Sequence, residues 1–197
     1  MPKKRGPLTI HSERPAFGNP WLLAVDYVVS TPKGREFTYT IVHFRNWATG
    51  VVPLHDDGTI TMVGQHRFAL DAYSWEIPEG GAEESEGPLE GAKRELAEEA
   101  KLGGGEWREI MQLHLSNSVT DEHAYIYLAT GLEPAEGEAD DTEELTIARV
   151  PFAEALAKVN SGEITDAITV AALLKVSHMA VMGELPGGLN ELLAPKR

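Results

Sequence analysis

The pattern of apolar and polar residues predicts strands over the first part of the chain. Residues 21–29 (WLLAVDYVV) and 37–44 (FTYTIVHF) are rich in β-branched and aromatic residues, which is typical of strands. A proline and a glycine lie between these two runs, so we expect a hairpin. A second hairpin is expected where Asp57-Gly58 separates TGVVPL from TITMVGQHRF, because this dipeptide favours tight reversals.

A helical period appears after residue 88. The apolar residues of this segment recur at spacings that place them on one helix face: Leu89, Ala92, Leu96 and Ala100. The pattern predicts a helix from Pro88 to about Lys101, ended by the glycines at 103–105.

The rest of the chain mixes strands and helices. We expect strands at 107–114, 123–132 and 145–150, and helices near 151–160 and 165–182. The acidic segment before residue 145 is expected to be a loop, and the last residues a loosely held tail. This irregular order predicts an α+β (mixed α/β) fold rather than a doubly wound sheet. We expect residues 1–45 to form a small separate sheet and residues 46–197 the main domain.

Composition limits the range of partners. Lys and Arg total 17 against 31 Asp and Glu, which gives a net charge of −14. Such a surface repels phosphate backbones and disfavours nucleic-acid binding, although metal ions would still allow a small anionic substrate. There are no cysteines, which excludes thiol catalysis and favours a cytoplasmic protein. We expect no signal peptide and no membrane span, because no apolar run is long enough.

The predicted helix at 88–101 carries crowded carboxylates opposite its apolar face. Glu95, Glu98 and Glu99 lie within about one turn, and Arg94 is the only basic residue placed to reach Glu98 at i+4. Such a group is often a solvated helix face. It is also what a hard cation such as Mg²⁺ requires, since several oxygens must converge on the ion.

Residues 80–102 resemble the Nudix box, the signature of the Nudix hydrolases. The matching positions are Gly80, Glu86, Arg94, Glu95, Leu96, Glu98, Glu99 and Leu102. Lys101 stands where the box has a glycine, so the left-handed residue that ends the helix is expected at Gly103 instead.

The resemblance implies a role for each charged residue of the box. The implied ligands of Mg²⁺, or of Mn²⁺ as a substitute, are the backbone carbonyl of Glu79 and the carboxylates of Glu95, Glu98 and Glu99. Glu98 is expected either to bind the metal or to orient a water on it. Arg94 is expected to brace the glutamates, with Glu86 at the edge of the site.

The segment GQHRFALDAYSWEIPEGG is similar to the lead-in of ADP-ribose and nucleoside-diphosphate-sugar pyrophosphatases. By this similarity Arg67 is expected to contact phosphate or ribose, and Glu76 the nucleotide. The alternative for Arg67 is a plain surface arginine. Arg45 and Glu122 are further substrate-binding candidates. In the loop ADDTEEL, the implied catalytic base is Glu143, with alternates at Glu144 and Asp141.

The implied fold is an α/β/α sandwich with a mixed central sheet, plus an N-terminal antiparallel sheet that builds a homodimer. The implied reaction is Mg²⁺-dependent hydrolysis of ADP-ribose or a related nucleoside diphosphate sugar to a nucleoside monophosphate and a sugar phosphate. The run LSNSVTDEH lacks the Ser-Pro-Gly segment common in ADP-ribose enzymes, which widens the choice of sugar. The alternatives are a Nudix hydrolase acting on dinucleoside polyphosphates, coenzyme A or NADH, or a non-catalytic ligand sensor. A sensor is disfavoured because every box carboxylate is present.

Overall fold

The computed structural model describes residues 3–138 and 144–194. The chain forms two compact units: Met1–Trp47 with His114–His123, and Ala48–Leu113 with Ala124–Arg197.

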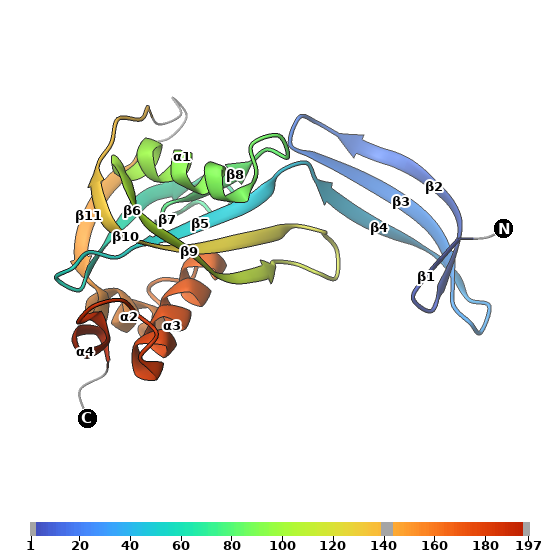
Figure 1. The fold of residues 1–197 in the computed structure, drawn as a ribbon. Coiled ribbons are helices and arrows are strands. Elements are labelled where there is room, and N and C mark those ends of the chain that lie inside the picture. Colours follow the sequence, from blue (N-terminus) through green and yellow to red (C-terminus); the bar gives the residue numbers. More distant parts are fainter. Residues whose placement is uncertain (1–2, 139–143, 195–197) are drawn as a thin grey trace. The chain divides into compact units, whose positions relative to one another are not determined.

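The first unit is an antiparallel sheet of four strands in sequence order (Figure 1). Its strands are β1 (Lys3–Arg5), β2 (Leu8–Gly18), β3 (Leu22–Ser30) and β4 (Glu36–Phe44). The hairpin expected between the first two apolar runs is confirmed, because β3 and β4 pair from Leu22 with Phe44 to Ser30 with Glu36. Sequence patterning missed β2, whose residues after Ile10 are all exposed. The core of this unit is small and contains Ile10, Val25, Tyr27 and Val29.

Residues 114–123 are tied to strand β4. The Val42 amide donates to the Val119 carbonyl at 2.9 Å, and the Asp121 amide donates to the Val42 carbonyl at 3.3 Å. The Asp121 carboxylate also lies 2.5 Å from Nδ1 of His43. These contacts explain why a segment distant in sequence belongs to the first unit.

The second unit contains two sheets. One has the order β8 (Glu79–Ala82), β5 (Trp47–Pro53), β10 (His123–Pro134) and β9 (Leu102–His114), and the other the order β11 (Thr146–Pro151), β6 (Thr59–Arg67) and β7 (Ala72–Glu76). Strands β5 and β10 run parallel, whereas β6 pairs antiparallel with both of its neighbours. The second unit therefore contains both parallel and antiparallel strand pairs, in different sheets.

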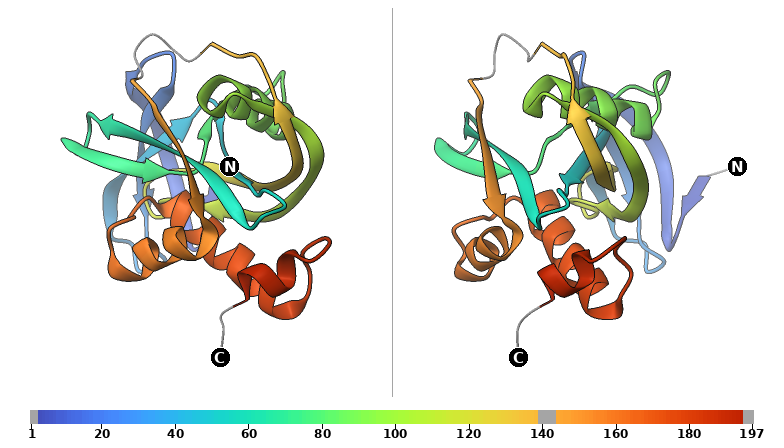
Figure 2. Two further views of the ribbon diagram at one scale, coloured as in Figure 1. Left: turned by 90° about the vertical axis from the view of Figure 1, so that its left-hand side faces the viewer. Right: turned by 60° about the vertical axis from the view of Figure 1, so that its left-hand side comes forward.

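The helices of the second unit are α1 (Pro88–Ala100), α2 (Phe152–Ser161), α3 (Ala167–Met182) and α4 (Leu189–Leu193). Helix α1 lies on one side of the strands and the other three lie on the opposite side (Figures 1 and 2). The apolar face predicted for α1 is confirmed: Ala92, Leu96 and Ala100 are buried in a cluster with Val51 and Tyr127. Burial of this face leaves the glutamates of α1 on its other sides.

The second predicted hairpin is wrong beyond its turn. Gly58 adopts φ 78°, as a tight reversal there requires, and Leu54 forms an isolated bridge with Ile60. The flanking strands β5 and β6 then separate into different sheets. The turn signal fixed a local reversal, but β5 is buried along most of its length and pairs with β8 and β10 instead.

The predicted loose C-terminal tail is also wrong for its described part. Helix α4 buries Leu189 and Leu193. The side chain of Asn190 accepts from the Leu185 amide at 2.9 Å and donates to the Leu185 carbonyl at 2.8 Å. Two leucines and one asparagine hold this segment in place.

The end of α1 differs from the sequence prediction. Lys101 itself is left-handed, at φ 57° and ψ 34°, and Gly103 lies in strand β9. The Lys101 ammonium donates to the carbonyls of Glu98 at 2.9 Å and Gly137 at 2.7 Å. These bonds offset the strain of a residue with a Cβ in this conformation, about 1 kcal/mol.

In the two described ranges of the chain, the helices are too short or too polar to cross a bilayer.

Two substitutions at Lys101 separate backbone strain from the ammonium contacts. Both Lys101→Gly and Lys101→Ala remove these contacts, but only alanine keeps a Cβ at positive φ. We expect the glycine variant to be more stable than the alanine variant by about 1 kcal/mol, measured by chemical unfolding. Equal stability of the two variants would show that the left-handed cap costs nothing.

Candidate functional site

The box glutamates gather where α1 packs against β8. Glu95 lies directly against Gly80, since a Cβ built on Gly80 would be 2.3 Å from Oε1 of Glu95. The glycine therefore makes room for this carboxylate, which is 14% exposed. A close approach of this kind requires glycine whatever its backbone angles.

Arg94 lies among three of the carboxylates. Its Nε donates to Oε1 of Glu86 at 2.8 Å, and its Nη1 donates to Glu95 at 2.9 Å and to Glu98 at 2.8 Å. Nη2 also donates to the Gly81 carbonyl at 2.7 Å. The hydrogen bond with Glu86 is the main cause that raises the pKa of Arg94. The same bond is the main cause that lowers the pKa of Glu86. The arginine thus fixes α1 to the strand and orients the glutamates.

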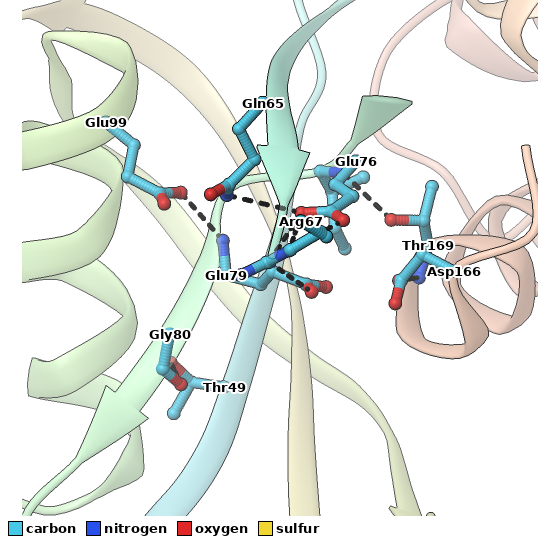
Figure 3. Close-up of polar contacts among 10 residues, drawn as sticks. Thr49, Gln65, Arg67, Glu76, Glu79, Gly80, Glu99, Asp166 and Thr169 are labelled. Atoms are coloured by element: carbon cyan, nitrogen blue, oxygen red, sulfur yellow. Dashed lines mark hydrogen bonds and ion pairs between the residues drawn. The ribbon is translucent and has the colours of Figure 1, made fainter. Parts of the chain in front are cut away.

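Glu99 is buried and faces the start of β8. Its Oε2 accepts a hydrogen bond from the Glu79 amide at 2.9 Å (Figure 3). Glu98 is the more accessible of the two, with 29% of its side chain exposed. The two adjacent glutamates therefore differ in solvent access: Glu99 is buried and binds the main chain at Glu79, whereas Glu98 is partly exposed to water.

Arg67 and Glu76 form an ion pair at the ends of β6 and β7. Nε of Arg67 donates to Oε1 of Glu76 at 2.9 Å, and Nη2 of the same arginine donates to Glu79 at 3.3 Å. Burial opposes the charge of Arg67, but the hydrogen bond and the charge of Glu76 outweigh it and raise the pKa of the guanidinium. The alternative that Arg67 is a plain surface arginine does not fit, because its side chain is partly buried and paired with two glutamates.

The side chain of Glu79 points away from Glu99, toward Arg67 and Asp166 (Figure 3). Burial, followed by the charges of Asp166 and Glu76, raises its pKa well above the ordinary range. Sequence reasoning assigned Glu79 only a backbone carbonyl and gave no role to its carboxylate.

The remaining predicted residues belong to other segments of the chain. Arg45 is exposed and Glu122 is half-buried, and both belong to the first unit. Burial raises the pKa of Glu122. Glu144 is exposed, whereas Glu143 and Asp141 lie outside the described residues.

Three residues near the site were missed. Gln65 donates to Glu76 at 3.5 Å, Asp166 accepts from the Thr169 amide at 2.7 Å, and Thr169 accepts from the Ile77 amide at 2.9 Å. Asp166 is the N-cap of α3, and an Asp before an apolar helix is a readable capping signal. Its proximity to Glu79 has no local sequence signal.

Comparison with known proteins identifies the family. The model of the NUDIX domain matches residues 44–170. An ADP-ribose pyrophosphatase of Mycobacterium tuberculosis (strain ATCC 25618 / H37Rv) is 37% identical over 179 residues, covering 89% of this chain and 84% of that protein. An ADP-ribose pyrophosphatase of Bacillus subtilis (strain 168) is 33% identical over 147 residues, covering 74% and 79%. The chain belongs to the Nudix family.

A solved structure supports the fold. A crystal structure of an ADP compounds hydrolase superposes with a TM-score of 0.82, covering 93% of this chain and 100% of that one at 22% identity. The expectations of a Nudix fold and of a Nudix hydrolase are therefore confirmed.

The Nudix carboxylates fit a hard divalent cation. The donors are all oxygens, which Mg²⁺ prefers, and they converge from one turn of α1. Gly80 leaves space for Glu95, and Glu98 is open to solvent. The donor chemistry and the room around it both suit the ion that the family implies.

Alanine at Gly80 tests the need for this space. Because the added Cβ would meet the flexible end of Glu95, the carboxylate moves and the fold survives. We expect Gly80→Ala to weaken Mg²⁺ binding about tenfold or more in calorimetric titration, with little change in melting temperature. Gly188→Ala is the control, because a Cβ at Gly188 meets no described atom within 4 Å. Unchanged affinity in Gly80→Ala would remove Glu95 from the proposed ligand set.

Proposed function

We propose that the protein hydrolyses the diphosphate bond of ADP-ribose or a related nucleoside diphosphate sugar, giving a nucleoside monophosphate and a sugar phosphate. The proposed ligands of Mg²⁺ are the Glu79 carbonyl and the carboxylates of Glu95, Glu98 and Glu99. The similarity to two proteins named ADP-ribose pyrophosphatase supports this substrate class.

One observation carries the proposal: the negative charges of the carboxylates on and beside α1 outnumber the single positive charge of Arg94. Glu86, Glu95, Glu98 and Glu99 contribute −4 when ionised and Arg94 contributes +1, so the group carries −3. A diphosphate would be repelled by this charge. Bound divalent ions reverse the balance, neutralise phosphate oxygens and make a bound water more acidic.

The protein side chains divide the remaining work. Arg94 holds Glu95 and Glu98 in place, and Glu99 positions Glu79 through its amide. Since Glu98 is partly exposed, its proposed role is to bind the metal or to orient a water on it. Glu143 stays the proposed base for the attacking water, with Glu144 and Asp141 as alternates, as the family resemblance suggests.

The substrate is proposed to contact Arg67. The side chain of Arg67 is 34% exposed, so part of it stays accessible while Glu76 fixes its direction. A fixed guanidinium suits a phosphate or ribose better than a mobile one, because less entropy is lost on binding. Substrate contacts are also predicted for three further residues: Glu76, Arg45 and Glu122. The domain boundary at residue 45 and a homodimer built through the N-terminal sheet stay predictions as well.

A substrate panel tests the reaction. We expect Mg²⁺-dependent turnover of ADP-ribose or another nucleoside diphosphate sugar, measured as phosphate released by alkaline phosphatase from the two monoester products. The panel includes dinucleoside polyphosphates, coenzyme A and NADH, because preference for one of these would replace the proposed substrate class. Absence of turnover on every compound, with Mg²⁺ and with Mn²⁺, would favour a ligand sensor.

Amide substitutions test the box glutamates. Glu98→Gln and Glu99→Gln keep side-chain size and an acceptor oxygen but remove a charge, so we expect turnover to fall at least about 100-fold with the fold intact. Glu90→Gln is the matched control, since Glu90 is exposed on the same helix and pairs with Lys93. Wild-type turnover in both test variants would contradict the proposed metal site.

A further inference from the structure

A second group of carboxylates lies beside the box without belonging to it. Glu76 at the end of β7, Glu79 at the start of β8 and Asp166 before α3 each offer an oxygen, and these oxygens lie within 4.8 Å of one another. Figure 3 shows Glu79 between Glu99 on one side and Asp166 on the other. Only the main chain of Glu79 faces the box.

One oxygen of this group lacks a partner. Glu79 is 10% exposed, and its Oε2 is buried with no hydrogen-bond donor among the described residues. The neighbouring acids are held in place, since Glu76 is bonded to Arg67 and Asp166 to the Thr169 amide. A buried carboxylate oxygen without a donor costs free energy, so this geometry points to a missing positive partner.

The charge count defines that partner. With all three carboxylates ionised, as a bound cation would favour, the group and Arg67 sum to −3 + 1 = −2, which one divalent cation would balance. Hard divalent cations bind carboxylate oxygens at about 2.0–2.6 Å, so oxygens on opposite sides of one ion lie about 4–5 Å apart. The observed spread of up to 4.8 Å matches this range without large side-chain movement.

We propose that Glu76, Glu79 and Asp166 bind a hard divalent cation (Mg²⁺, Mn²⁺ or Ca²⁺) at a site separate from the box glutamates. The ion binds the Glu79 side chain while the Glu79 amide contacts Glu99, so it stabilises the start of β8 beside the catalytic carboxylates. This site does not depend on the hydrolysis proposed above. The competing explanation is a proton shared between Glu79 and Asp166, whose carboxylate oxygens lie within 4.8 Å of each other.

Counting bound Mn²⁺ distinguishes the two explanations. The full-length protein is titrated with Mn²⁺ and free ion is measured by electron paramagnetic resonance, without substrate. We expect Asp166→Asn, which keeps a capping oxygen for α3, to bind one Mn²⁺ fewer per chain than wild type. The double variant Glu98→Gln/Glu99→Gln is expected to retain the second ion. Glu163→Gln is the control, because Glu163 is exposed and pairs with Lys158.

A wild-type crystal soaked in Mn²⁺ gives the second readout, independent of whether any variant folds. We expect an anomalous difference peak among Glu76, Glu79 and Asp166. An unchanged Mn²⁺ count in Asp166→Asn, or a soaked crystal whose only peak is at the box glutamates, would overturn the proposal and favour the shared proton.

Discussion

Electrostatic repulsion among the glutamates that α1 directs toward β8 is the constraint on which the site depends. Arg94 contacts Glu86, Glu95 and Glu98, but one cation cannot balance the group. Like charges on adjacent helix turns destabilise a helix, and here burial of Ala92, Leu96 and Ala100 keeps the helix in place. The apolar face thus provides the stability that allows the opposite face to hold excess negative charge.

Glu79 connects the two acidic groups of the second unit. Its amide donates to Glu99, and its carboxylate lies with Glu76 and Asp166. The strand that carries Glu79 also carries Gly80, which leaves room for Glu95. A short segment of β8 therefore positions box carboxylates through its backbone and contributes to a second group through a side chain.

Much of the site was predictable because its residues are close in sequence. The Nudix box spans 80–102, and the apolar stripe placed Glu95 and Glu98 correctly relative to the core. Burial of Glu99 was not predictable, because it follows from packing of α1 against β8. Asp166 was missed for the same reason: about 90 residues separate it from Glu76, and only the tertiary fold brings their carboxylates together.

The errors in the fold also have physical causes. The turn at Asp57-Gly58 forms, but turn residues do not decide which strands pair afterwards, and β5 finds buried partners elsewhere. Lys101 ends α1 because its ammonium gains two carbonyl contacts that a sequence pattern does not reveal. Strand β2 was missed because its exposed residues lack the alternation of apolar and polar positions that marks a half-buried strand.

The most direct test of the central claim is a crystal structure with Mg²⁺ and a non-hydrolysable ADP-ribose analogue. We expect metal density between the diphosphate and the carboxylates of Glu95, Glu98 and Glu99. A diphosphate bound with no metal at these glutamates, under conditions that support turnover, would contradict it.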